Sequence, residues 1–201
     1  MEEGFHKVKG NKIIIYKRLD EHEIEQIKKH KNSTEIGLWH TKNKNLDFLQ
    51  ILNKLKAVDF YGIHTENFEA MATIETLERV FLNNIKNHNQ LSFLGSLKQI
   101  QELDLLYLSK LEKFPDLSNC QNLKSIRIMN CKKLTNIENL AFVPNLEEIN
   151  IIETPQTPED LEFLIQLPNI KYCSAQFGKN KLNSQFEKLL MKYGKTHYRP
   201  I

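Results

Sequence analysis

Apolar residues recur along the middle of the chain in a short pattern, L-x-x-L-x-L. The pattern is clearest in LKSIRI (123–128) and LEEINI (146–151), where the first, fourth and sixth positions are apolar. The second apolar position, the first inside each predicted strand, falls at residues 36, 58, 80, 103, 126, 149 and 173, in steps of 22 to 24. A fixed period of this kind is typical of repeat proteins, so it predicts one structural unit repeated about seven times.

The alternation within each copy predicts a short β-strand. Residues two apart along a strand point to the same face, so the apolar residues face a common core and those between them face outward. One unit cannot bury its own apolar side, and neighbouring units must stack on a parallel sheet. Segments 45–55, 65–77 and 157–167 have the apolar spacing of helices. Segment 113–123 is short and polar, and we expect it to be extended or tightly turned.

The residues before the repeats have the pattern of a cap. NKIIIYKRL (11–19) predicts a strand. After it, Asp20 and Glu23 match the capping box of a helix, with Leu19 and Ile24 as its hydrophobic staple. We therefore expect a strand and a helix to close the N-terminal end of the stack.

The residues after the repeats predict a second cap. Ser184 and Glu187 match another capping box, and Gly194 suits the end of that helix. The tail at 195–201 is expected to be loose. The segment 178–201 is basic, with six Lys or Arg against one acid. We expect a single structural domain with an N-terminal cap at 1–32, repeats at 33–177, and a C-terminal capping helix with a basic tail at 178–201.

The repeat resembles that of the leucine-rich repeat family, whose unit of roughly 20–29 residues reads L-x-x-L-x-L-x-x-N/C-x-L. In the best copy (123–137), Cys131 takes the Asn/Cys position and Leu134 and Ile137 follow it. The resemblance covers residues 33–177. It implies an α/β fold, a curved solenoid with a parallel sheet on its concave side, a mixed helical and extended convex side, and caps. It also implies that a partner protein binds the concave face.

Composition places the chain among globular proteins. Of its 201 residues, 40% are hydrophobic and 26% are charged, and no run of about 18 apolar residues could span a membrane. The first ten residues lack a secretory signal, and three cysteines do not suit a disulfide framework. We therefore expect a cytoplasmic protein. The excess of Lys over Arg, 24 to 4, is typical of an AT-rich genome, such as a bacterial one.

The sequence has no catalytic or metal-binding motif that its spacing supports. YGKT (193–196) matches the end of a phosphate-binding loop, but Leu189 stands where that loop requires another glycine. The cysteines form no C-x-x-C pair and the histidines no H-E-x-x-H. We expect no enzyme activity, no metal and no cofactor. The basic residues form no stripe along the chain, which disfavours general nucleic-acid binding.

The outward positions of the predicted strands form columns across the sheet. One column is mostly apolar, with Trp39, Tyr61, Leu106, Met129 and Ile152, and Phe81 and Tyr107 lie beside it. Charged side chains border it: Asp59, Asp104, Arg79, Arg127, Glu102 and Glu148. An apolar centre with a polar rim is typical of protein interfaces, so we predict that these residues bind a partner. The preference of strands for aromatic and aliphatic residues is the alternative explanation.

The leading hypothesis is a non-catalytic protein–protein interaction module. Glu35 and Glu153 raise the acids of these columns to six, against two arginines, so we expect a basic partner. A small cytoplasmic binder with an acidic face fits an inhibitor, such as an immunity protein that neutralises a toxin. Two alternatives stay open. One is an adaptor or regulatory subunit in a signalling or host–microbe complex. The other is a small-ligand or anion binder, or an enzyme, that uses the basic C-terminal cap.

Overall fold

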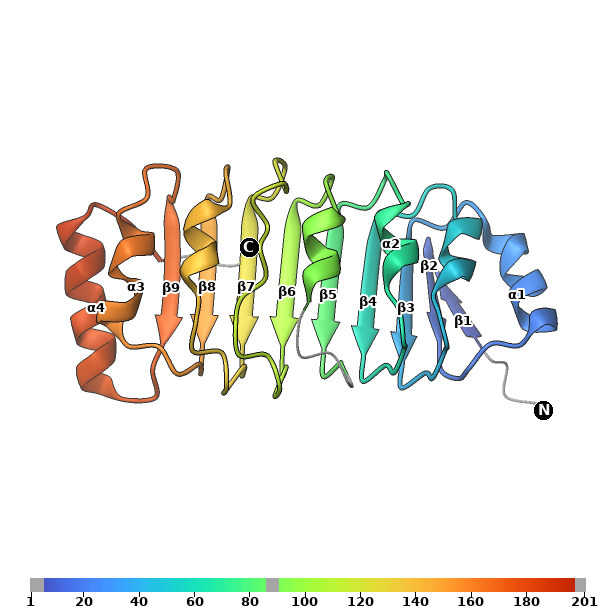
Figure 1. Ribbon diagram of the computed structural model, residues 1–201, viewed down its shortest axis with the longest axis horizontal. Helices are drawn as coiled ribbons and strands as arrows, with labels where there is room; N and C mark the ends of the chain where they lie inside the picture. Colours follow the sequence, from blue (N-terminus) through green and yellow to red (C-terminus); the bar gives the residue numbers. More distant parts are fainter. Residues whose placement is uncertain (1–5, 86–90, 198–201) are drawn as a thin grey trace.

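The computed structural model describes residues 6–85 and 91–197, and within these ranges the strands form one nine-stranded sheet. The strands lie in the sheet in the order of the sequence, as an open stack (Figure 1). The first pair is antiparallel, and every later pair from β2 to β9 is parallel. The strands are β1 (His6–Lys9), β2 (Lys12–Ile15), β3 (Glu35–Trp39), β4 (Ala57–Tyr61), β5 (Arg79–Asn83), β6 (Glu102–Leu106), β7 (Ser125–Met129), β8 (Glu148–Ile152) and β9 (Tyr172–Gln176).

The register of the parallel strands confirms the predicted repeat. Each inner apolar residue pairs with its counterpart one unit further on, as Ile36 does with Val58 and Ile126 with Ile149. These side chains are at most 1% exposed and belong to one continuous core. Strand β2 adds a further repeat unit, which the sequence analysis had predicted as part of the N-terminal cap. Its Ile13 pairs with Ile36, one more step of 23 residues upstream.

The helical connections cover one face of the sheet (Figure 1). They are η2 (Asp47–Ile51), α2 (Glu69–Ala72), η3 (Ser92–Ser96), η4 (Glu138–Phe142) and α3 (Pro158–Ile165), where η denotes a 3₁₀-helix. Helix α3 begins as predicted, with Thr157 as its N-cap and Pro158 as its first residue. Residues 113–123 contain turns and no helix, also as predicted.

The helices predicted over 45–55 and 65–77 are wrong in extent, because only η2 and α2 form there. Neighbouring strands lie about 4.8 Å apart, whereas packed helices need roughly 8–10 Å. Consecutive units can therefore each carry a full helix only where the stack curves enough to spread its helical side. A single short turn is enough to bury Leu46 and Leu49, which are at most 1% exposed. The spacing of the apolar residues in these segments correctly predicted that they are buried, but it predicted helices that are too long.

Every strand from β3 to β8 is followed by a residue in the left-handed region of φ. These residues, which we call the turn ladder, are His40, Gly62, Asn84, Tyr107, Asn130 and Glu153, with φ between 51° and 59°. The N–H of each donates to the last carbonyl of the next strand, from His40 to Tyr61 at 2.7 Å through to Glu153 to Gln176 at 3.0 Å. Left-handed φ favours Gly and Asn and is strained for larger residues. The ladder residues therefore turn the chain out of the sheet.

The N-terminal cap has one strand more than predicted. The segment 11–19 is a strand only over β2, and β1 precedes it as a hairpin partner through Gly10, whose φ is 60°. The capping box of α1 (Glu21–Ile27) is confirmed. Asp20 Oδ1 accepts the N–H of Glu23 at 2.8 Å, and Glu23 Oε2 accepts the N–H of Asp20 at 3.0 Å. Helix α1 continues into η1 (Lys28–His30). Residues 1–5 of the predicted cap lie outside the described residues.

The C-terminal helix α4 (Asn180–Lys192) begins earlier than predicted. Ser184 is not its N-cap, because the helix already starts at Asn180. Asn183 in the first turn has another use, since its Oδ1 accepts the N–H of Phe177 at 3.1 Å. This side chain takes the place of the strand that would follow β9. Gly194, with φ of 64°, follows the end of the helix as predicted.

The start of the C-terminal tail is ordered, contrary to the expectation of a loose segment. Thr196 forms a parallel bridge with Tyr172 at the outer edge of β9, and its carbonyl accepts the N–H of Cys173 at 2.9 Å. An uncovered strand edge presents free N–H and C=O groups, so this contact closes part of that edge. Residues 198–201 of the tail lie outside the described residues.

Candidate functional site

The outward side of β2 to β9, which we call the sheet face, carries the predicted site residues. An apolar row crosses it, composed of Tyr16, Trp39, Tyr61, Phe81, Leu106, Met129 and Ile152. Trp39 is in register with Tyr61, and Leu106 with Met129 and then Ile152. The row shifts by two residues at β5, where Asn83 is in register with Leu106 and the aromatic residue is Phe81. The structure thus brings the predicted apolar residues into one band.

The N-terminal half of the apolar row is a chain of aromatic rings. The ring centroids of Tyr16 and Trp39 lie 5.5 Å apart at 90°, and those of Trp39 and Tyr61 5.4 Å apart at 63°. Tyr61 and Phe81 follow at 4.9 Å. Edge-to-face and tilted pairs at these distances are favourable because the ring edge is positive and the ring face negative. The prediction missed Tyr16, although it lies 23 residues before Trp39 and so obeys the repeat.

Trp39 occupies space that Gly37 leaves free. A Cβ atom at Gly37 would lie 3.1 Å from Trp39 Nε1 and 3.6 Å from the Cε of Lys12. Any larger residue at Gly37 would therefore push against the indole. The indole N–H is buried and has no hydrogen-bond partner among the described residues. A buried donor without an acceptor costs roughly 1–3 kcal/mol, so the packing of Trp39 carries an energetic penalty.

The C-terminal half of the apolar row is aliphatic and less exposed than predicted. Leu106 is only 9% exposed, so it is not an accessible contact residue. Met129 and Ile152 are half-buried. Tyr107 belongs to the turn ladder and is 50% exposed, which places its ring at the end of the strands beside the row. The accessible apolar surface here consists of Met129, Ile152 and Tyr107.

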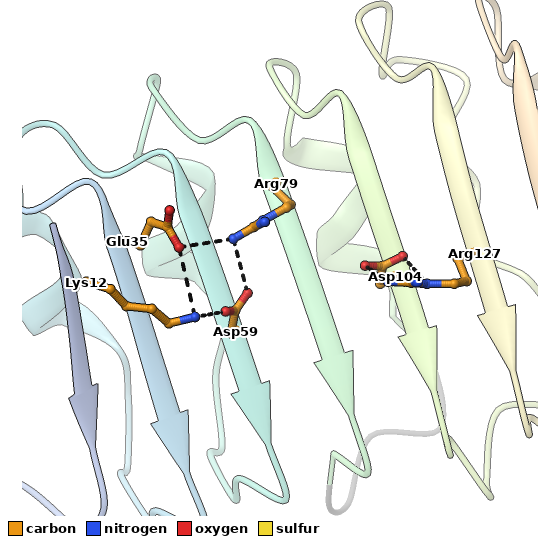
Figure 2. A network of polar contacts seen from close by, with 6 residues as sticks. All are labelled: Lys12, Glu35, Asp59, Arg79, Asp104 and Arg127. Atoms are coloured by element: carbon orange, nitrogen blue, oxygen red, sulfur yellow. Dashed lines mark hydrogen bonds and ion pairs between the residues drawn. The ribbon is translucent and has the colours of Figure 1, made fainter. Parts of the chain in front are cut away.

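Most acids of the N-terminal half are neutralised by the chain itself (Figure 2). Asp59 accepts from Lys12 Nζ, and Arg79 Nη2 lies 3.2 Å from Glu35 Oε2 and 3.7 Å from Asp59 Oδ1. Two cations and two carboxylates therefore form one network across β2 to β5. The prediction counted Arg79 but missed Lys12, because β2 was not assigned to the repeat.

Asp104 is also paired within the chain (Figure 2). Arg127 holds it by two parallel hydrogen bonds, from Nε to Oδ1 at 2.9 Å and from Nη2 to Oδ2 at 2.7 Å. Glu153 lies 3.1 Å from Lys132. The predicted excess of six acids over two arginines thus overstates the free negative charge. Among the described residues, only Glu102 and Glu148 of this set have no cation within ion-pair distance.

Two cations of the basic C-terminal cap form contacts within the fold. Lys195 Nζ donates to the carbonyls of Leu167 at 3.1 Å and Ile170 at 2.6 Å. Lys192 Nζ lies 2.9 Å from Glu162 Oε1, and that carboxylate also accepts from the Tyr193 hydroxyl at 2.6 Å. These contacts tie α4 and the residues after it to the last repeat. They engage two of the six Lys and Arg residues whose charge suggested an anion site.

Other side chains capable of chemistry are buried or dispersed. Burial raises the pKa of the Cys120 thiol to about 11 and that of Cys173 to about 12, and it also raises the pKa of Cys131. A thiol must lose its proton to react, so these cysteines are poor nucleophiles. Over residues 6–85 and 91–197, no three His, Cys, Asp or Glu side chains are grouped so as to hold a metal ion. The same ranges contain no helix with the length and apolar character for a membrane crossing.

Comparison with solved structures identifies the class of fold. An internalin of Listeria monocytogenes matches with a TM-score of 0.57 and 18% sequence identity, over 88% of this chain and 52% of the internalin chain. This chain therefore spans about half the length of that internalin. Internalin C2 of the same organism matches with a TM-score of 0.37 and 16% identity, over 74% of this chain and 84% of its own. No protein-family model and no curated protein matches the sequence.

Internalins are leucine-rich repeat proteins, and the chain has the fold of a leucine-rich repeat solenoid. This confirms the architecture expected from the repeat alone. Similarity at 18% identity establishes the fold, and the role of the chain has to be argued from its own residues.

Proposed function

We propose that the chain is a non-catalytic module that binds a partner protein across the sheet face. The observation that supports this proposal is the apolar row, which runs over strands β2 to β8 on the side of the sheet away from the described helical connections (Figure 1). Large apolar patches on one surface mark interaction sites, and Trp, Tyr and Met are enriched at the centres of such sites.

The rim of the apolar row supports the same proposal. The ion pairs of Lys12, Asp59 and Arg79, and of Asp104 and Arg127, hold their side chains in fixed positions before any partner arrives. Aromatic side chains that pack on one another also have few rotamers left to lose. Binding to such a surface costs little conformational entropy, which favours affinity.

The proposal is tested by capture with two matched variants. Met129→Asp places a charge in the apolar row, and Phe142→Asp makes the same kind of change on η4, where Phe142 is 63% exposed. The wild type and both variants, each checked by circular dichroism, serve as bait in extracts of the source organism. We expect mass spectrometry to find a partner with wild type and Phe142→Asp and to lose it with Met129→Asp.

A partner that all three baits retain would contradict the proposal and move the site to the convex side or the caps. Loss of the partner by Phe142→Asp alone would lead to the same conclusion about the location of the site. If none of the baits captures a protein, the result would favour the alternative of a small-ligand site at the basic cap.

For the narrower role we propose an inhibitor, such as an immunity protein that neutralises a toxin, acting in the cytoplasm. The support is the remaining acidity of Glu102 and Glu148 beside the apolar row, which suits a basic enzyme. The test is to assay the activity of the captured partner with and without the chain. Loss of that activity in the complex supports an inhibitor. Unchanged activity supports the adaptor or regulatory subunit.

A further inference from the structure

A hollow lies on the sheet face over Ser125, where a small residue stands between two long ones. The register places Glu102, Ser125 and Glu148 side by side on β6, β7 and β8, with the two glutamates about 9.6 Å apart as two strand spacings. The next outward positions are Asp104, Arg127 and Asn150. These six outward side chains line the hollow.

The hollow presents hydrogen-bond acceptors, and the one cation in its lining is already paired. Arg127 is engaged by Asp104 through its two hydrogen bonds. Burial raises the pKa of the Glu148 carboxyl, and the adjacent Ser125 hydroxyl partly offsets that rise. The Oδ1 atom of Asn150 is buried and has no donor among the described residues. Two carboxylates thus flank one small space, and Asn150 completes its lining.

Elsewhere in the same outward column, cations of the chain itself lie beside the acids. Along the register the column reads Lys12, Glu35, Ala57, Arg79, Glu102, Ser125 and Glu148. On β2 to β5 the chain supplies its own cations, because Lys12 and Arg79 reach Asp59 and Glu35 lies 3.2 Å from Arg79 (Figure 2). On β7 the corresponding position is Ser125, and the two glutamates beside it have no such cation.

We propose that the hollow over Ser125 receives an arginine side chain of the partner protein. The inference rests on the proposed function and names the charged contact within it. A guanidinium group carries five N–H donors in one plane, so it can bond to acceptors on several sides at once. A lysine has three donors at a single point and matches the spread of Glu102, Glu148 and Asn150 less well. Neighbouring Met129 and Ile152 would receive apolar residues flanking the arginine.

The test uses a small probe that does not require the partner. N-acetyl-arginine methylamide is titrated into the ¹⁵N-labelled chain and followed by NMR, with N-acetyl-citrulline methylamide as its uncharged equivalent. We expect saturable shifts confined to β6, β7 and β8, including the side-chain amide of Asn150. Citrulline should produce none, because it lacks the charge. The shifts should weaken with added salt, since the contact is electrostatic and partly exposed.

Matched variants assign the effect to the hollow. The double variant Glu102→Gln, Glu148→Gln should bind the arginine probe about tenfold more weakly or not at all, since it removes both charged acceptors. The double variant Glu112→Gln, Glu159→Gln removes the same charge from exposed acids elsewhere and should bind as wild type. Ser125→Arg should place the chain's own guanidinium in the hollow and abolish the titration while circular dichroism stays unchanged.

Equal titration by citrulline would overturn the inference, as would unaltered binding by the Glu102→Gln, Glu148→Gln variant or by Ser125→Arg. These failures are distinct from failure of the proposed function. If Met129→Asp loses a captured partner while the arginine probe does not bind, the sheet face is the interface and the hollow is not its arginine site. If the probe binds in the hollow and no partner depends on Met129, the proposed function fails instead.

Discussion

The bidentate pair of Arg127 with Asp104 offers a quantitative test of how the sheet face holds its charges. The perturbation is Arg127→Met, which keeps much of the apolar stem and removes the guanidinium. Asp104 would then keep its charge without its partner, at a position where its side chain is only 18% exposed. An exposed pair of the same kind, Lys132 with Glu153, serves for comparison because its side chains are 62% and 48% exposed.

The magnitude follows from distance and exposure. Two unit charges about 4 Å apart interact by about 4 kcal/mol at an effective dielectric constant of 20. Arg127 is 40% exposed, so water screens part of this energy. We expect Arg127→Met to lower the free energy of unfolding by about 1–3 kcal/mol, as for hydrogen bonds between charged groups. In a double-mutant cycle with Asp104→Asn, the coupling should be about 1–2 kcal/mol. The cycle of Lys132→Met with Glu153→Gln should give about 0–0.5 kcal/mol.

The assay is urea denaturation followed by circular dichroism, at low and at high salt. High salt should reduce the small coupling of Lys132 with Glu153 more, in proportion, than that of Arg127 with Asp104. Equal couplings for the two pairs would refute the reasoning. The acids of the sheet face would then not be held by the chain, and the distinction between paired Asp104 and unpaired Glu102 would lose its basis.

Three further predictions concern a tight backbone contact and the buried thiols. In urea denaturation, Gly95→Ala should lower the free energy of unfolding by about 1–3 kcal/mol, as overpacking does. The reason is that the added Cβ would lie 2.6 Å from the Asp116 carbonyl oxygen. A loss of stability no larger than that of the exposed Ser96→Ala variant would contradict this prediction. At pH 8 the thiols should react with iodoacetamide at least about 100-fold more slowly in native protein than in urea, since burial raises the pKa of Cys120 from 9.0 to about 11 and that of Cys173 to about 12. Above pH 9 the unfolded chain releases thiol protons that the folded chain keeps, so Tm should fall from pH 9 to 11, and less so in a Cys120→Ala, Cys173→Ala variant.

The strands could be predicted from the sequence because their signal is local and repeated. Ile126 and Ile128 alternate with polar residues, and the same alternation returns at a fixed step, so each copy supports the others. The step also sets the register, because a shift by one residue would turn every apolar side chain to the wrong face. The fold and the position of the apolar row follow from this information alone.

Other features depend on contacts that a repeat does not specify. Lys12 and Tyr16 were missed because the 19 residues between the end of β2 and the start of β3 hold a helix outside the pattern. The step of 23 from Ile13 to Ile36 was the available signal. The pairing of Lys12 with Asp59 joins residues 47 apart and depends on side chains reaching across β3. Leu106 is buried by its neighbours, although its position in the pattern faces outward.

The turn ladder gives the solenoid a direction. Each turn donates its N–H to the strand that follows, so a unit depends for this bond on its C-terminal neighbour and never on its N-terminal one. Among the described residues no strand follows β9, and the N–H of Phe177 instead donates to the side-chain amide oxygen of Asn183. Loss of α4 removes the acceptor of Phe177, the residue that follows β9, whereas damage at β1 or β2 leaves this acceptor and every acceptor of the ladder in place. Damage to α4 therefore leaves a backbone donor at the C-terminal end of the sheet without its acceptor, whereas damage at β1 or β2 leaves no donor of the ladder without one.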